Sequence, residues 1–311
     1  MVAEQEHITV LLKEAVTALL SDADGFYVDG TFGRGGHSEM ILGEMSRDGR
    51  LLAIDKDEQA VATGISMFGQ DPRFDIAQGS FANLQSFLEA RQVMGKVSGI
   101  LLDLGVSSPQ LQQATRGFSF KHDGPLDMRM DQSAGQTASE WVNRASDTEI
   151  VRILREYGEE RFAKRMARAI LNARAHLPIT TTAQLAKIIA DANPAWERGK
   201  HPATRAFQAI RIFINNELGD LQEVLAQSLE ALSIGGRLVV ISFHSLEDRM
   251  VKRFIKSHER DYSLPIGVPV TEDYFVQRLR RLGKAVKPSA GEIQANPRAR
   301  SAIMRVAEKL V

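Results

Sequence analysis

The chain has 311 residues, of which 43% are hydrophobic and 25% are charged, and its 39 basic residues balance its 39 acidic ones. This composition is typical of a soluble globular protein of one large or two ordinary domains, and no apolar run approaches the length of a membrane span. The absence of cysteine excludes disulfides, cysteine-based zinc sites and thiol catalysis, and with an acidic N-terminus that lacks a signal-peptide core it favours a cytoplasmic protein.

The first hundred residues alternate helical and strand patterns. A helix capped by Thr9 and ending near Leu20 opens the chain. Strands are then predicted at 26–30, 50–54, 74–78 and 97–103, with helices near 36–45, 57–67 and 82–91 between them. Near-continuous apolar strands that alternate with amphipathic helices predict a parallel sheet. We therefore expect an α/β fold with a doubly wound sheet.

This alternation stops after residue 103. A loop rich in Gly, Ser, Pro and Asp is predicted at 107–136, the segment 138–231 is almost entirely helical, and a strand follows at 235–243. In the tail, 283–288 and 301–307 are predicted to form a terminal β-hairpin. The sheet domain is thus expected to be interrupted by a helical insertion.

The expected boundaries are 1–110 for the first part of the sheet domain, 111–212 for the insertion and 213–311 for the second part. The insertion follows the fourth strand, at the edge where ligands of such sheets bind. Substrate recognition is therefore favoured for it over a purely stabilising role.

A glycine-rich turn follows the first strand. It carries Gly30, Gly33, Gly35 and Gly36 directly after Asp29. Its D-G-x-x-G-x-G-G spacing differs from the dinucleotide fingerprint and from the P-loop. It is similar to motif I of class I S-adenosylmethionine methyltransferases, where the turn holds the methionine end of the cofactor.

Two acidic residues end later strands. Asp55 ends the second strand and is predicted to accept hydrogen bonds from ribose hydroxyls; capping of the next helix is the alternative. Asp103 ends the fourth strand and precedes a turn that contains Pro109. This arrangement resembles the motif with which amino-group methyltransferases accept hydrogen bonds from the target amine. The alternative is that Asp103 caps a turn or bonds only to the cofactor.

Longer strings resemble the bacterial RsmH (MraW) family nearly from end to end, including the helical insertion. They lie at 30–37, 103–110, 116–120, 124–130, 157–161, 201–212, 241–249 and 296–301. The resemblance implies a class I methyltransferase that uses S-adenosylmethionine to methylate N4 of a cytidine in small-subunit (16S) rRNA, near the decoding centre. It implies the small ribosomal subunit as partner and no metal or membrane.

The resemblance also assigns site residues. The cofactor contacts would be Gly35, Gly36, His37, Asp55, Phe81, Asp103 and Gln110. The catalytic candidates are Asp103 and His244, and for His244 lining of the pocket is favoured over a role as general base. Phe118, Phe120 and Phe243 are the candidates to stack on the target base, because aromatic stacking on a splayed-out base is usual in RNA recognition. Arg205 is predicted to point toward the cleft and contact the substrate. Ser245 and Asp248 have the spacing of a capping box.

Although the net charge of the chain is zero, basic residues are concentrated in two segments that could contact RNA phosphates. One cluster on the insertion comprises Arg152, Arg155, Arg161, Lys164, Arg165, Arg168 and Arg174. The other, in the tail, comprises Arg278, Arg280, Arg281, Lys284, Lys287, Arg298, Arg300 and Arg305. Because Glu156, Glu159 and Glu160 lie among the first set, the tail is the preferred RNA-contacting surface.

Other functions fit the sequence less well. An NAD-dependent oxidoreductase is disfavoured by the glycine spacing, and a non-catalytic RNA-binding factor by the intact cofactor motif and Asp103. An amino methyltransferase that acts on DNA or on a small-molecule amine is the main alternative. The sequence leaves the target nucleotide and the possible formation of a homodimer undetermined.

Overall fold

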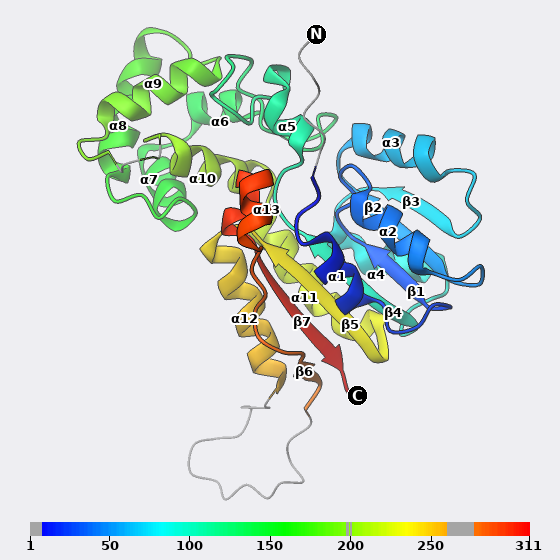
Figure 1. The fold of residues 1–311 in the computed structure, drawn as a ribbon. Coiled ribbons are helices and arrows are strands. Elements are labelled where there is room, and N and C mark those ends of the chain that lie inside the picture. Colours follow the sequence, from blue (N-terminus) through cyan, green and yellow to red (C-terminus); the bar gives the residue numbers. More distant parts are fainter. Residues whose placement is uncertain (1–7, 197–198, 200, 260–276) are drawn as a thin grey trace, which may run out of the picture. The chain divides into compact units, whose positions relative to one another are not determined.

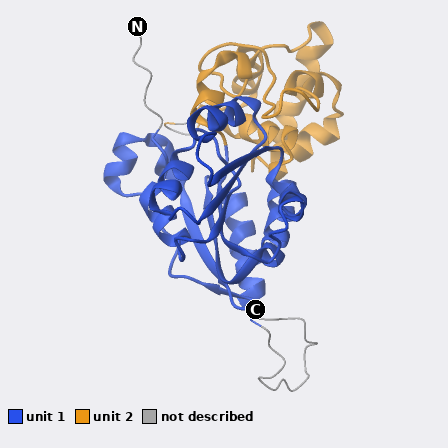
Figure 2. Ribbon diagram, turned by 90° about the vertical axis from the view of Figure 1, so that its right-hand side faces the viewer, with its two compact units in different colours: residues 1–105, 218–311 blue, residues 106–217 orange. Residues whose placement is uncertain are grey.

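The computed structural model describes residues 8–196, 199, 201–259 and 277–311. It divides into two compact units, unit 1 (Met1–Gly105 and Leu218–Val311) and unit 2 (Val106–Glu217), which Figure 2 distinguishes by colour. Gln110 therefore belongs to unit 2. Within the described ranges, no helix is both long enough and apolar enough to cross a membrane.

Unit 1 contains a seven-stranded sheet of order β3-β2-β1-β4-β5-β7-β6 (Figure 1). The strands are β1 (Phe26–Asp29), β2 (Arg50–Asp55), β3 (Phe74–Gln78), β4 (Val97–Asp103), β5 (Leu232–Ser242), β6 (Leu279–Arg281) and β7 (Ile303–Lys309). β1 to β5 are parallel, whereas β7 runs antiparallel to both β5 and β6. The expected α/β doubly wound sheet is confirmed, and the carboxyl ends of β1, β2 and β4 meet at one edge.

Helices cover both faces of this sheet. One face carries α1 (Leu12–Leu19), α2 (Gly36–Glu44) and α3 (Glu58–Phe68), and the other carries α4 (Leu84–Ala90), α11 (Glu217–Ala231) and α12 (Ser245–Glu259). Neighbouring residues of a strand enter opposite clusters: Leu101 packs with α1 and Leu102 with α4. Burial on both faces explains why the strands are apolar without alternation.

Unit 2 is helical and has a core of its own. Its helices are α5 (Ser108–Gln112), α6 (Ala138–Arg144), α7 (Asp147–Glu156), α8 (Ala163–His176), α9 (Thr182–Ala192) and α10 (Thr204–Ile214). Trp141, Ile153 and Ile170 are among the buried residues of its core. Capping boxes fix the starts of α6 and α9, the latter formed by Thr181 and Gln184. Such local signals explain why the sequence predicts this part as helical.

Three local predictions are wrong. Thr9 does not cap α1, which begins after Leu11, whose N–H donates to Glu292 Oε1 at 2.7 Å. The loop predicted at 107–136 contains α5 and a 3-10 turn (Ala114–Arg116). The segment 283–288 is not a strand: β6 lies earlier, where Leu279 is buried, and only Val286 forms an isolated bridge.

Candidate cofactor and catalytic site

The glycine-rich turn links β1 to α2 and needs glycine for two different reasons. Gly35 has φ 80° and occupies the N-cap position of α2, a left-handed conformation that side chains disfavour. At Gly36 the obstacle is contact, because an added Cβ would lie 2.0 Å from Thr9 Oγ1. At Gly33, which has φ 56°, an added Cβ would by contrast lie within 4 Å of a single atom of the described residues, Thr31 O at 3.9 Å. The outer side of the turn therefore has room for a ligand.

Asp29, at the end of β1, holds this turn together. Its Oδ1 accepts a hydrogen bond from Thr31 N at 3.1 Å, and its Oδ2 accepts one from Ser38 Oγ at 2.7 Å. Burial raises the pKa of Asp29 to about 6, although both hydrogen bonds act to lower it. The sequence analysis noted this acid before the first glycine but did not include it among the site residues.

Asp55 connects the end of β2 to the same turn. Its Oδ2 accepts a hydrogen bond from Gly33 N at 2.7 Å, and its Oδ1 accepts one from Asp57 N at 2.9 Å. Burial raises the pKa of Asp55 to about 6. Asp57, not Asp55, caps α3. Each carboxylate oxygen of Asp55 keeps a further lone pair and can still accept a hydrogen bond. Its predicted interaction with a ribose hydroxyl therefore stays a prediction that is chemically feasible.

Asp103 ends β4 next to His37 of α2. Its N–H donates to Thr31 Oγ1 at 2.6 Å, and its Oδ2 lies 3.7 Å from His37 Nδ1. Its Oδ1 is buried and accepts no hydrogen bond from any residue that the structure describes. Burial, followed by the carboxylates of Asp29 and Glu247, raises the pKa of Asp103 well above its usual range. A ligand with a hydrogen-bond donor would supply the interaction that Oδ1 lacks.

His244 follows β5 and is held by Glu247. Their side chains lie 3.1 Å apart, between Nε2 and Oε1. The other oxygen of Glu247 accepts hydrogen bonds from Phe243 N at 2.8 Å and His244 N at 3.2 Å, so this carboxylate caps the start of α12. The carboxylate of Asp248 pairs with both Arg305 Nε and Nη2. Glu247 N also donates to His244 Nδ1, at 3.4 Å, whereas His244 Nε2 makes no hydrogen bond with any residue that the structure describes. The imidazole thus lies against a buried acid and keeps one ring nitrogen for a ligand.

Asp220 of α11 joins the ends of two strands and was missed by the sequence analysis. Its Oδ2 accepts a hydrogen bond from Ser80 Oγ at 2.5 Å and lies 2.5 Å from Lys56 Nζ. Phe81, the predicted adenine neighbour, comes directly after Ser80 and is half-buried. Because Asp220 is 140 residues from Ser80, no local pattern could reveal this contact.

Phe243, next to His244, belongs to unit 1 and is half-buried, and the other predicted site residues belong to unit 2. Gln110 is buried, and its Oε1 accepts a hydrogen bond from Ser107 N at 3.0 Å within the capping box of α5. Phe118 is 6% exposed and belongs to the core, which leaves little ring surface for a base. Phe120 is partly exposed, with its ring centroid 4.5 Å from that of His201. Arg205 is half-buried on α10.

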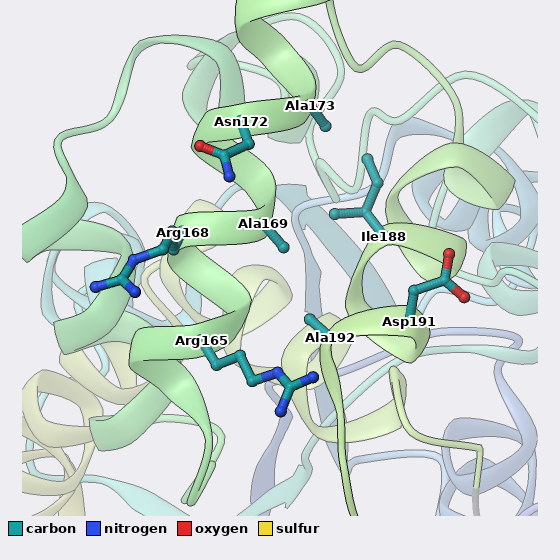
Figure 3. Close-up of a pocket in the computed structure, with 8 residues that line it drawn as sticks. All are labelled: Arg165, Arg168, Ala169, Asn172, Ala173, Ile188, Asp191 and Ala192. Atoms are coloured by element: carbon teal, nitrogen blue, oxygen red, sulfur yellow. The ribbon is translucent and has the colours of Figure 1, made fainter.

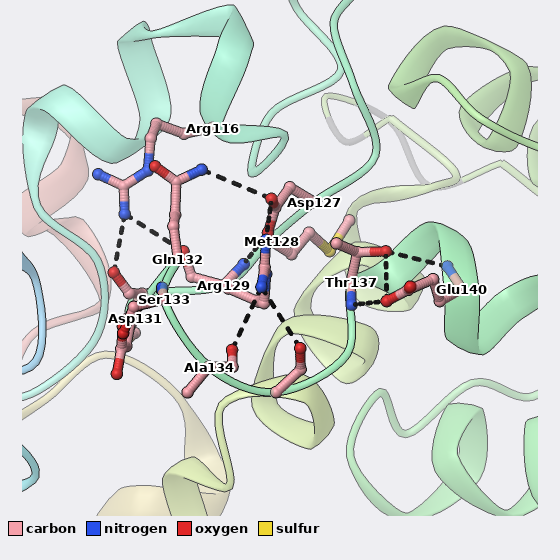
Figure 4. Close-up of polar contacts among 12 residues, drawn as sticks. Arg116, Asp127, Met128, Arg129, Asp131, Gln132, Ser133, Ala134, Thr137 and Glu140 are labelled. Atoms are coloured by element: carbon pink, nitrogen blue, oxygen red, sulfur yellow. Dashed lines mark hydrogen bonds and ion pairs between the residues drawn. The ribbon is translucent and has the colours of Figure 1, made fainter.

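The loop that carries both phenylalanines is tightly connected (Figure 4). Arg116 donates to the carbonyl oxygens of Arg129 at 3.2 Å and Met130 at 2.9 Å. The guanidinium of Arg129 donates two hydrogen bonds to Asp127, at 2.8 and 2.9 Å, and Arg129 N donates a third, at 3.0 Å. At Gly117, which has φ 71°, an added Cβ would lie 2.3 Å from a backbone oxygen. The segment 124–130 therefore stabilises the conformation of this loop through its own hydrogen bonds.

Trp196 is an aromatic side chain that the sequence analysis did not consider. It is 65% exposed, and its ring centroid lies 6.2 Å from that of His201. Single exposed hydrophobic side chains are common on protein surfaces, so the exposure of Trp196 makes its ring accessible to a ligand but does not by itself indicate one. Its position after Pro194, in a short connection between two helices, is a signal that could have drawn attention to it.

Comparisons with known proteins give one family match. The model of the MraW methylase family matches residues 4–310. Among solved structures, a Clostridium thermocellum protein described as an rRNA methylase is 12% identical, with a TM-score of 0.46 and coverage of 97% of this chain and 99% of that one. An rRNA methylase from Streptococcus thermophilus is also 12% identical, with a TM-score of 0.41 and coverage of 96% and 92%. At these scores the family match alone bears on function.

Proposed function

The chain belongs to the MraW methylase family, and from this premise we propose that it methylates N4 of a cytidine in small-subunit (16S) rRNA near the decoding centre. The methyl donor of this family is S-adenosylmethionine. The observation that carries the proposal is the buried Oδ1 of Asp103 at the end of β4, an acceptor to which none of the described residues donates. We also propose a cytoplasmic location, where its substrate would be found.

The chain's residues fit the cofactor. The open side of the turn at Gly33 suits the methionine end, and we propose Gly35, Gly36 and His37 as its contacts there. Asp55 would accept hydrogen bonds from the ribose, and Phe81 would lie beside the adenine, since an aromatic ring can pack on a purine face. When bound, the cofactor supplies an electrophilic methyl group on a sulfonium.

Asp103 would orient the amine. The lone pair of an exocyclic amine is delocalised into its ring, so the amine is a poor nucleophile. Acceptance of one of its N–H groups by Asp103 Oδ1 would turn the lone pair toward the methyl carbon and place the reacting atoms in line. The bound cofactor would supply the methyl group and its sulfur would keep the electrons of the broken C–S bond, while the amine nitrogen held by Asp103 would form the new N–C bond and release one proton to water. His244, held by Glu247, would line this site.

Unit 2 would recognise the RNA around the target. An unpaired base offers a flat face that stacks on aromatic rings. Among the described residues of this unit, Phe120 and Trp196 offer exposed aromatic surface, whereas Phe118 lies in the core. Phe243 of unit 1 is half-buried and remains a candidate for contact with the target base.

The test is methyl transfer from labelled S-adenosylmethionine to small ribosomal subunits and to naked rRNA, both from a strain that lacks this protein. Mass spectrometry of the nucleosides identifies the modified atom. We expect N4-methylated cytidine, and its loss in Asp103→Ala with cofactor binding retained. Methylation at another atom, or none in either substrate, contradicts the proposal. DNA and small amines, assayed in parallel, test the alternative amino acceptors.

A further inference from the structure

An open groove of about 450 Å³ separates α8 from α9 in unit 2 (Figure 3). Its lining comprises Arg165, Arg168, Ala169, Asn172 and Ala173 of α8 and Ile188, Asp191 and Ala192 of α9. Small apolar side chains thus alternate with long polar ones. The volume is in the range of sites for small ligands, so the groove can hold a piece of a polymer about as large as one nucleotide.

The charge on α8 is entirely positive. This 14-residue helix carries Lys164, Arg165, Arg168 and Arg174 and contains neither Asp nor Glu. Arg174 is engaged, because it donates to Val142 O at 2.7 Å. In the described part of the chain, no acid pairs with Lys164, Arg165 or Arg168, and all three are exposed. Two guanidinium groups that line the groove therefore have no anionic partner among the described residues.

The single acid in the groove is already neutralised. Asp191 lies 2.8 Å from Lys187 Nζ, one helical turn away on α9. In Figure 3, Arg165 extends from α8 toward α9, whereas Arg168 extends from the opposite side of α8. With Asp191 paired to Lys187, α8 keeps both positive charges, one directed toward α9 and one at the rim of the groove. An anionic occupant would neutralise them.

The basic tail differs in part from α8. Four of its arginines pair with acids: Arg278 with Glu230, Arg280 with Glu308, Arg281 with Glu259 and Arg305 with Asp248, at 2.7, 2.5, 3.7 and 2.7 Å. Those acids are distant in sequence, so local patterns do not show these pairs. Lys284, Lys287 and Arg300 of the tail are exposed and lie outside the four pairs, so both surfaces keep basic groups for RNA, and those of α8 lie beside a groove.

We propose that the groove between α8 and α9 binds the phosphate–ribose backbone of the substrate RNA, outside the target nucleotide. This proposal rests on the proposed function. Arg165 and Arg168 would contact phosphate oxygens, for which the planar guanidinium has matching donors. Asn172 would donate to or accept from a ribose hydroxyl, and the floor of Ala169, Ala173 and Ile188 would contact the sugar. Such contacts hold the RNA without reading its sequence.

The decisive experiment compares two double variants of the full chain. Arg165→Gln/Arg168→Gln removes the groove charges, and the control Arg47→Gln/Lys96→Gln removes two exposed basic residues of unit 1 that belong to neither basic cluster. The dissociation constant for 16S rRNA and for small subunits is measured from about 50 to 200 mM salt, the range over which phosphate contacts change affinity most clearly. All four side chains are exposed, so folding should persist, and circular dichroism checks it.

We expect the groove variant to bind RNA at least about tenfold more weakly at the lowest salt concentration. The slope of log affinity against log salt should become shallower by about 1.4 to 1.8, for two lost phosphate contacts. The KM for RNA should rise with little change in kcat, and cofactor affinity should not change. Asp191→Asn should tighten binding. Equal salt slopes for the groove and control variants would overturn the proposal. Polyglutamate is the probe for an acidic protein partner, and a groove variant that loses polyglutamate binding but keeps its RNA affinity would also overturn it.

Failure of the two proposals can be told apart. If the wild-type chain produces no N4-methylated cytidine, the proposed reaction fails whatever the binding data show. If methylation occurs and both double variants retain the same RNA affinity and salt slope, the reaction stands and the groove proposal fails.

Discussion

Replacement of Asp29 by asparagine should change how stability responds to pH. The Asp29 side chain is 1% exposed, and its burial raises the pKa from 3.8 to about 6. The folded chain therefore binds this proton more tightly than the unfolded chain does, and acidification below about pH 6 stabilises the fold until the unfolded pKa is reached. From about pH 8 to about pH 5 this single group contributes about 1.4 kcal/mol.

The assay is urea unfolding of wild type and Asp29→Asn at the same two pH values. Asparagine is nearly isosteric and can still bond to Thr31 N and Ser38 Oγ, the present partners of Asp29. The stability gained on acidification should be about 1.4 kcal/mol smaller in the variant. Asp48→Asn, which alters a side chain 71% exposed, is the control for loss of one charge. If Asp29→Asn gains as much stability on acidification as wild type does, burial of this carboxyl does not raise its pKa.

Four further predictions concern the turns and the site. Gly117→Ala should destabilise the fold by more than about 3 kcal/mol because its Cβ meets backbone, whereas Gly135→Ala, with no atom within 4 Å and φ 76°, should cost about 1–2 kcal/mol in guanidinium unfolding. Asp55→Asn provides one acceptor where two N–H groups donate, so calorimetry should show cofactor affinity reduced about tenfold. The kcat/KM for methyl transfer should rise with pH through the elevated pKa of Asp103; an acid limb at the ordinary carboxyl value of about 4 would contradict this. Trp196→Ala should weaken RNA binding about tenfold while Trp196→Phe retains most of it, and equal affinities for both would argue against stacking.

The sequence alone determined the features that depend on neighbouring residues. The apolar strands predicted the parallel sheet, because a strand buried on both faces requires apolar residues at nearly every position. The turn from Asp29 to Gly36 predicted the cofactor edge, because a positive φ favours glycine. The helices of unit 2 were visible for the same reason, through their spacing and capping residues. The resemblance to a family added roles for individual residues. The structure places two of these residues, Asp55 and Asp103, at the ends of strands, as the sequence predicted.

Only the tertiary structure decided which charged groups neutralise one another. Asp220 meets Ser80 across 140 positions, and Arg305 meets Asp248 across 57. Local sequence patterns carry no information on such pairs, since they form where separate elements pack. For the same reason the sequence did not show that the fold buries Phe118, a predicted substrate contact, in the core of unit 2. Nor did it show that four arginines of the tail pair with acids from other elements.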